Sequence, residues 1–279
     1  MALIQLNFLS ACLMRTVTVN AVVPFDKLAA PGAKPAPKRP FKTLYLLHGI
    51  FGNYTDWVSG TRVQRWAEAK DLAVIMPSGE NHFYVDCAAN GERYAEFIGR
   101  ELPEKMQQLF GLSPRREDNF IAGLSMGGYG AIVTGLRYRE RFGCIAGLSS
   151  ALLLDQMARP DPAKPDLASA VFGPRFIETV FGPPAALQGG DKDYYALARK
   201  AVEAGGPLPS MYLCCGLDDG LLEANRAYAQ FLRRLGIPCT YEEGPGAHEW
   251  DFWDAYLKKI LDWLPLEAEN EGVTSGHIG

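Results

Sequence analysis

The stretch "NFIAGLSMGGYG", residues 119–130, places a serine between glycines, after an apolar run and before a helix-like segment. A strand that ends at G-x-S-x-G and continues as a helix is typical of the nucleophile elbow of an α/β-hydrolase. Gly123 and Gly127 would let the two backbones pass closely while the serine adopts a strained conformation. The chain holds 29 glycines in 279 residues, so the motif also arises by chance. Ser125 is the candidate nucleophile, and the segments around it must show whether the motif is functional or accidental.

Strand-like and helix-like segments alternate along most of the chain. Two strands are expected within residues 2–23, where Thr16 to Val23 alternates between apolar and other residues. Further strands are expected at "KTLYLLHG", "DLAVIMP", "NFIAGL", "CIAGLSS", "SMYLCCG" and "IPCTYEE". This pattern predicts an α/β fold with an eight-stranded, mostly parallel sheet flanked by helices, its first two strands forming an antiparallel ribbon. We expect one domain over residues 1–266 and a disordered acidic tail over 267–279.

Residues 151–209 interrupt this alternation with many prolines and short apolar pieces. A long insertion after the carboxyl end of a strand lies at the edge where open α/β sheets bind ligands. We therefore predict a small cap over the active site.

A serine hydroxyl needs a general base, and in this fold the order along the chain is serine, acid, histidine. The chain has four histidines: His48, His82, His248 and His277. The first two precede Ser125, and His277 lies in the polar tail. His248, in a glycine-rich loop between the last strand and the last helix, is the candidate base.

The acid should follow a strand between the serine and the histidine. "MYLCCGLDDGLL" runs from an apolar strand into Asp218 and Asp219 and then into a helix. One of them should accept the Nδ1–H of His248 and fix its tautomer. Spacing does not choose between these two aspartates.

The fold also predicts an oxyanion hole of two backbone N–H groups. Met126 supplies one at the start of the helix that follows the nucleophile, and Ile50, after "LYLLHG", is the candidate for the other. We expect His48 to orient this loop and not to carry protons.

The composition argues against several function classes. The net charge of −4 gives no basic surface for nucleic acid, and no apolar run is long enough to span a membrane. The six cysteines have no metal-ligand spacing, and no zinc-hydrolase or phosphate-binding motif is present. The N-terminus has no basic residue before its apolar stretch, which favours a strand and a cytoplasmic protein over a signal peptide.

Six segments together resemble the tributyrin esterase family: "ALIQLNF…LMRTVTVN", "LYLLHGIFGNYTDWV", "AVIMPSGENHFYVD", "AGLSMGGYGA", "CGLDDGLLEAN" and "GPGAHEWDFWDAYL". That family is related to S-formylglutathione hydrolase (esterase D) and feruloyl esterases. The resemblance extends from Ala2 to about Leu264. It implies Ser125 as nucleophile, His248 as base and Asp219 as acid, with the N–H groups of Ile50 and Met126 as oxyanion hole. His82 in "ENHFYVD" departs from the pattern.

The leading hypothesis is a serine carboxylesterase for short acyl esters, acetyl or butyryl, with hydroxycinnamoyl esters as a further class. It would need no metal or cofactor, and its partner would be a small-molecule ester. An S-formylglutathione hydrolase is the nearest alternative; an acyltransferase and a non-catalytic binding protein are more remote. The sequence leaves open whether the chain forms a homo-oligomer.

Overall fold

The computed structural model describes residues 1–26, 40–87, 89–159 and 167–266. Their centre is an eight-stranded sheet in the order β1-β2-β4-β3-β5-β6-β7-β8. The strands β1 and β2 are antiparallel, β2 is antiparallel to β4, and all other neighbours are parallel. This confirms the predicted sheet and its antiparallel ribbon. The strands are β1 (Ala2–Ser10), β2 (Arg15–Val23), β3 (Lys42–Leu47), β4 (Leu72–Pro77), β5 (Asn119–Leu124), β6 (Cys144–Leu148), β7 (Ser210–Gly216) and β8 (Cys239–Gly244).

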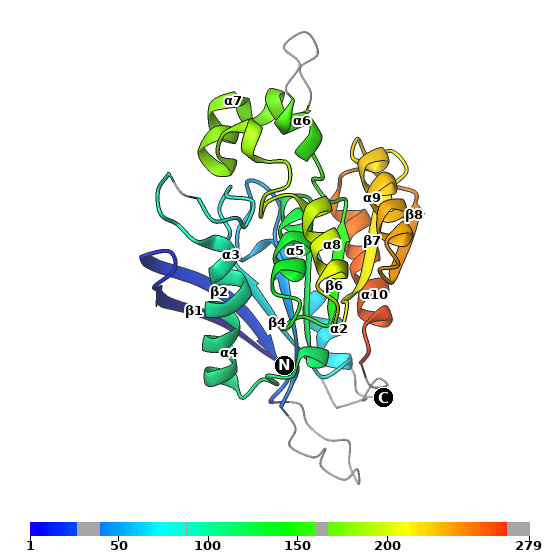
Figure 1. Cartoon of the computed structure of the whole chain (residues 1–279). Coiled ribbons are helices and arrows are strands. Elements are labelled where there is room, and N and C mark those ends of the chain that lie inside the picture. The colour runs from blue at the N-terminus through cyan, green and yellow to red at the C-terminus, as the bar shows by residue number, and fades with distance from the viewer. Residues whose placement is uncertain (27–39, 88, 160–166, 267–279) are drawn as a thin grey trace.

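Helices cover both faces of the sheet, each over its own apolar core (Figure 1). One face packs against α4, α5, α8 and α9, and the other against α1, α2 and α10. Because the central strands are buried on both faces, they are continuous apolar runs, as in "NFIAGL". The helices are α1 (Asp56–Gly60), α2 (Val63–Ala69), α3 (Tyr94–Glu96), η1 (Phe97–Glu101), α4 (Leu102–Phe110), η2 (Arg116–Asp118), α5 (Met126–Arg137), α6 (Leu154–Ala158), α7 (Leu167–Phe181), η3 (Pro184–Ala186), α8 (Tyr194–Glu203), α9 (Leu222–Arg234) and α10 (Trp250–Trp263).

The predicted cap over residues 151–209 was too long. Figure 1 shows α6 and α7 above the carboxyl ends of the strands, whereas α8 lies beside α5 in the helix layer. Tyr194 of α8 is buried and contacts Tyr129 of α5 edge-to-face, with the ring centroids 6.1 Å apart. The helix α8 is therefore the crossover from β6 to β7 and belongs to the core. The prolines before it concealed this ordinary βαβ unit in the sequence.

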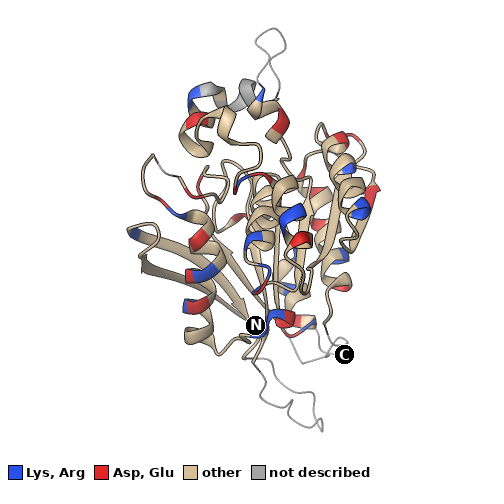
Figure 2. Ribbon diagram, viewed as in Figure 1, with Lys and Arg blue, Asp and Glu red and all other residues tan. Residues whose placement is uncertain are grey.

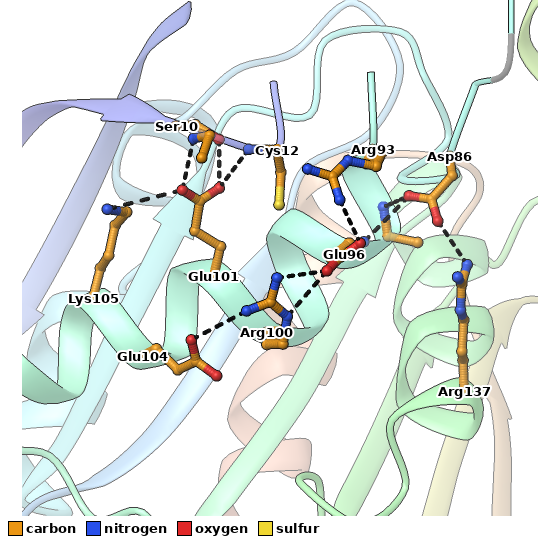
Figure 3. A network of polar contacts seen from close by, with 12 residues as sticks. Ser10, Cys12, Asp86, Arg93, Glu96, Arg100, Glu101, Glu104, Lys105 and Arg137 are labelled. Atoms are coloured by element: carbon orange, nitrogen blue, oxygen red, sulfur yellow. Dashed lines mark hydrogen bonds and ion pairs between the residues drawn. The ribbon is translucent and has the colours of Figure 1, made fainter. Parts of the chain in front are cut away.

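The turn between β1 and β2 is anchored by a buried carboxylate, Glu101, at the end of the π-helical turn η1 (Figure 3). Glu101 accepts hydrogen bonds from the Ser10 hydroxyl at 2.6 Å and from the N–H groups of Ala11 and Cys12 at 2.8 and 3.1 Å. Burial would raise the pKa of Glu101, but these hydrogen bonds outweigh it and lower the pKa below its ordinary value. The hairpin is therefore fixed to α4 by an ionised group.

Two predictions from the sequence concern residues that the structure does not describe. The acidic tail over 267–279 and part of the proline-rich cap, 160–166, lie outside the described residues. Within the described residues, no helix combines the length and apolarity that crossing a membrane requires.

Candidate active site

Ser125 occupies the sharp turn between β5 and α5. Its backbone has φ 53° and ψ −117°, a conformation that costs a residue with a side chain about 1–3 kcal/mol. The turn is held by its neighbours, because the Ser125 N–H donates to Leu148 O at 2.9 Å and its carbonyl accepts from the Ala151 N–H at 2.9 Å. The side chain is largely enclosed, with the residue 8% exposed. The loop after β6 thus supports the strained serine on both sides.

The two glycines of the motif are required by close backbone approach. A Cβ on Gly123 would lie 2.3 Å from the carbonyl oxygen of Gly127. A Cβ on Gly127 would lie 2.4 Å from the carbonyl oxygen of Leu47, at the end of β3. Any larger residue at either position would push α5 away from the sheet and move Ser125 with it.

Ser125, His248 and Asp219 form a continuous hydrogen-bonded chain. The Ser125 Oγ lies 3.0 Å from His248 Nε2, and His248 Nδ1 lies 2.9 Å from Asp219 Oδ2. A carboxylate can only accept, so Nδ1 carries the proton and Nε2 is the acceptor that faces the serine hydroxyl. This geometry suits removal of the hydroxyl proton by His248.

The two adjacent aspartates have different surroundings. Asp219 is buried, and its second oxygen, Oδ1, accepts the N–H of Leu221 at 2.9 Å. Burial would raise the pKa of Asp219, but hydrogen bonds from His248 and Leu221 outweigh it and lower the pKa. Asp218 is exposed, and its backbone N–H donates to Gly246 O at 3.0 Å. The structure therefore brings Asp219 to the histidine and leaves Asp218 facing solvent.

Two residues that the sequence did not reveal contact members of the hydrogen-bonded Ser125–His248–Asp219 series. The Trp253 indole contacts the His248 ring edge-to-face, with centroids 4.9 Å apart, and its Nε1–H donates to Ser149 Oγ at 3.2 Å. The fully buried Ser149 hydroxyl also contributes to lowering the pKa of Asp219. "CIAGLSS", residues 144–150, carries Ser149 directly after β6, the neighbour of the elbow strand, so its position in the sheet was the available signal.

The predicted oxyanion donors lie on either side of Ser125. Met126 is the first residue of α5, so its N–H has no acceptor within the helix. A Cβ on Gly49 would lie 3.6 Å from Ser125 Cβ, so the peptide that carries the Ile50 N–H passes close to the serine. Both N–H groups therefore lie near the serine, and their role as the oxyanion hole stays a prediction.

His48 holds the loop that carries Ile50. Its Nε2 accepts the Gly79 N–H at 2.8 Å, so the proton is on Nδ1, which lies 2.6 Å from the Gly49 carbonyl oxygen. Within one peptide unit the C=O and N–H point in opposite directions. By holding the Gly49 carbonyl, His48 sets the direction of the Ile50 N–H. Burial lowers the pKa of His48, which favours the neutral ring.

The remaining predicted residues take no part in the hydrogen-bonded chain. His82 stacks on Tyr94 with centroids 4.9 Å apart, and its Nε2 lies 3.4 Å from a carboxylate oxygen of Glu92. His277 lies outside the described residues. In the described part of the chain, no group of three or more His, Cys, Asp or Glu side chains is arranged to hold a metal ion.

Comparison with known proteins agrees with this geometry. Residues 13–264 match the family model described as "Putative esterase". The chain belongs to this esterase family. It is 40% identical to an acetyl esterase of Caldicellulosiruptor saccharolyticus over 264 residues, covering 95% of this chain and 98% of the relative. The chain is therefore a carboxylic ester hydrolase of the α/β-hydrolase fold.

Two solved structures from Staphylococcus aureus are also similar. The serine hydrolase FphF has a TM-score of 0.81 and 31% identity, covering 94% of this chain and 98% of FphF. The S-formylglutathione hydrolase FrmB has a TM-score of 0.79 and 30% identity, with the same coverage of 94% and 98%. The resemblance seen in the sequence is thus confirmed over nearly the whole chain.

Proposed function

We propose that the protein hydrolyses short-chain acyl esters, acetyl esters foremost, through a Ser125–His248–Asp219 triad. The observation that carries the proposal is the hydrogen-bonded chain from Ser125 Oγ through both nitrogens of His248 to the buried Asp219. The acetyl preference is supported by the 40% identity to an acetyl esterase.

In the first half of the reaction, Ser125 Oγ attacks the ester carbonyl while His248 Nε2 takes the hydroxyl proton. The carbonyl oxygen becomes negative and is stabilised by the N–H groups of Ile50 and Met126. The new Ser125–acyl bond stays as the bond to the alcohol breaks, and His248 gives its proton to the leaving oxygen. Asp219 stabilises the positive charge that His248 holds between these steps.

In the second half, a water molecule takes the place of the alcohol. His248 removes a proton from it, and the resulting hydroxide attacks the acyl carbonyl. The bond to Ser125 then breaks, His248 returns the proton to Oγ, and the carboxylic acid leaves. Every proton transfer passes through Nε2 of His248. The side chains of the triad are therefore restored at the end of the cycle.

A panel of acyl substrates tests the substrate preference. We expect kcat/KM to be highest for p-nitrophenyl acetate, lower for the butyrate and much lower for the octanoate and methyl ferulate. Ser125→Ala serves as the control for activity that does not depend on the triad. A higher kcat/KM for octanoate or ferulate than for acetate would contradict the acetyl preference.

A thioesterase is the second candidate, because the chain is 30% identical to FrmB over nearly its full length. The same triad can attack a thioester carbonyl, so only the preferred substrate distinguishes an esterase from a thioesterase. A kcat/KM for S-formylglutathione far above that for acetyl esters would favour this alternative. The cytoplasmic location stays a prediction.

A further inference from the structure

The strand β1 forms one edge of the sheet. All nine of its residues pair with β2, and no other strand in the described part of the chain pairs with its outer side. Such an edge presents backbone N–H and C=O groups to which another strand can add, and proteins usually protect it with charges or proline. Residues Ala2–Ser10 contain neither, and Figure 2 shows β1 without charged positions. The edge is therefore open to pairing.

Exposed apolar side chains gather on the same hairpin. Among the described residues, seven large hydrophobic side chains are exposed, and four of them lie on or directly beside β1 and β2. They are Leu3, Leu9, Met14 and Phe25, with exposures of 46%, 69%, 82% and 61%. Apolar surface gathered in this way marks an interaction site.

The sequence of β1 is nearly symmetric in chemical character about Leu6. When the strand is paired antiparallel with a second copy of itself, centred on Leu6, every residue from Leu3 to Leu9 faces one of its own kind. The opposed pairs are Ala2 with Ser10, Leu3 with Leu9, Ile4 with Phe8, and Gln5 with Asn7. A two-fold interface requires this kind of self-complementarity. A second copy of this chain is therefore the partner that the edge fits.

The cations at the two ends of the strand are each paired with two carboxylates of the same chain. The Met1 ammonium lies 3.0 Å from Asp26 and 3.2 Å from Glu68. At the other end, Arg15 lies 3.4 Å from both Glu80 and Glu92. A second copy would therefore meet no unpaired cation at either end of the edge. The bonds of Glu101 to the turn hold the strand in place before it pairs (Figure 3).

We propose that two copies of the chain associate by antiparallel pairing of β1 with β1, centred on Leu6, which joins their sheets into one. Ser125 follows the central strand β5, and His248 and Asp219 follow β8 and β7 at the other side of the sheet, so both active sites stay open. The interface does not depend on the proposed acyl preference.

Site-directed cross-linking tests the register. We would make Leu3→Cys and Leu9→Cys in a Cys239→Ser background, because the other five cysteines are buried. The proposed pairing puts position 3 opposite position 9 of the partner, whereas two positions 3 lie six residues apart, about 20 Å. A disulfide-linked dimer should form in the equimolar mixture and not in either variant alone. No cross-link in the mixture, or equal cross-linking of one variant alone, would overturn the proposal.

Charge variants test whether the strand drives assembly. By light scattering after size exclusion, the wild type should be a dimer. Gln5→Lys with Asn7→Lys should make it a monomer, because each lysine would face a lysine. Gln5→Lys with Asn7→Glu should restore the dimer, because each lysine would face a glutamate.

Gln5 and Asn7 are both exposed, so all three proteins should keep the same circular dichroism and the same p-nitrophenyl acetate turnover per chain. A monomeric wild type, or a lysine pair that leaves the dimer intact, would overturn the proposal. So would isolation of the wild type with β1 bound to a different protein in place of a second copy.

Discussion

The indole Nε1–H of Trp253 donates a hydrogen bond to the buried hydroxyl of Ser149 at 3.2 Å. The same indole packs edge-on against His248, and the same hydroxyl helps to lower the pKa of Asp219. The two residues therefore link the surroundings of the base to those of its acid.

Replacing the indole by a smaller ring tests this coupling. Trp253→Phe should keep an aromatic contact with His248 but lose the bond to Ser149. A hydrogen bond is worth about 0.5–1.5 kcal/mol, so kcat should fall by about two- to thirteenfold while KM changes little. Trp263→Phe, which alters an indole that packs on Tyr212, is the matched control and should retain wild-type kcat. Equal losses in both variants would point to a general loss of packing.

The neighbouring aspartates give a sharp internal comparison. Asp219→Asn should lower kcat by about 10⁴, because the amide no longer holds the right tautomer of His248. Asp218→Asn should leave kcat near the wild-type value, since that side chain is exposed. Steady-state kinetics with p-nitrophenyl acetate measure both, and a larger loss in the Asp218 variant would show that the acid is assigned to the wrong residue.

His48 should matter for the oxyanion hole and not for proton transfer. His48→Ala removes the contact with the Gly49 carbonyl and the acceptor for Gly79 N–H, so the Ile50 N–H loses its fixed direction. Loss of one oxyanion donor typically costs about 10²–10³ in kcat, and we expect a loss toward that range with little change in KM. His82→Ala, a histidine outside the hydrogen-bonded chain, should stay near wild type. Wild-type kcat in the His48 variant would contradict this role.

The anchor at Glu101 should make stability depend on acid pH. The pKa of Glu101 is lower in the folded chain than in the unfolded chain. Its stabilisation is therefore complete above the unfolded pKa of about 4.3 and is lost as pH falls through the folded pKa. Urea unfolding of Glu101→Gln should show a deficit against wild type at pH 7 that shrinks toward pH 3. Glu104→Gln, which alters a half-exposed carboxylate of α4 that does not contact the turn, is the control, and a deficit of constant size would contradict the sign.

The order of residues along the sequence was enough to predict much of the candidate active site. The position of Ser125 at the end of an apolar strand, and of His248 after the last strand, depends on local pattern, and both lie where expected. The sequence could not separate Asp218 from Asp219, because tertiary contacts orient that loop. A Cβ on Gly216 would lie 2.3 Å from Gly246 O, so the acid and histidine loops touch there and turn Asp219 inward.

The features that the sequence missed share one physical cause. Ser149 and Trp253 lie 104 positions apart, and Glu101 lies 91 positions from Ser10, so no local pattern links them. The extent of the cap was misjudged because prolines before α8 broke the alternation. The buried face of α8, with Tyr194 and Ala198, is visible only once β6 and β7 are neighbours.

The proposed mechanism requires that Ser125 form a covalent acyl-enzyme. Intact-mass and peptide mass spectrometry after brief treatment with a fluorophosphonate, which traps an activated serine, tests this most directly. We expect one adduct per chain, on the peptide that contains Ser125, and none in Ser125→Ala, with loss of p-nitrophenyl acetate turnover in step with labelling. An adduct on another residue, or equal labelling of Ser125→Ala, would contradict it.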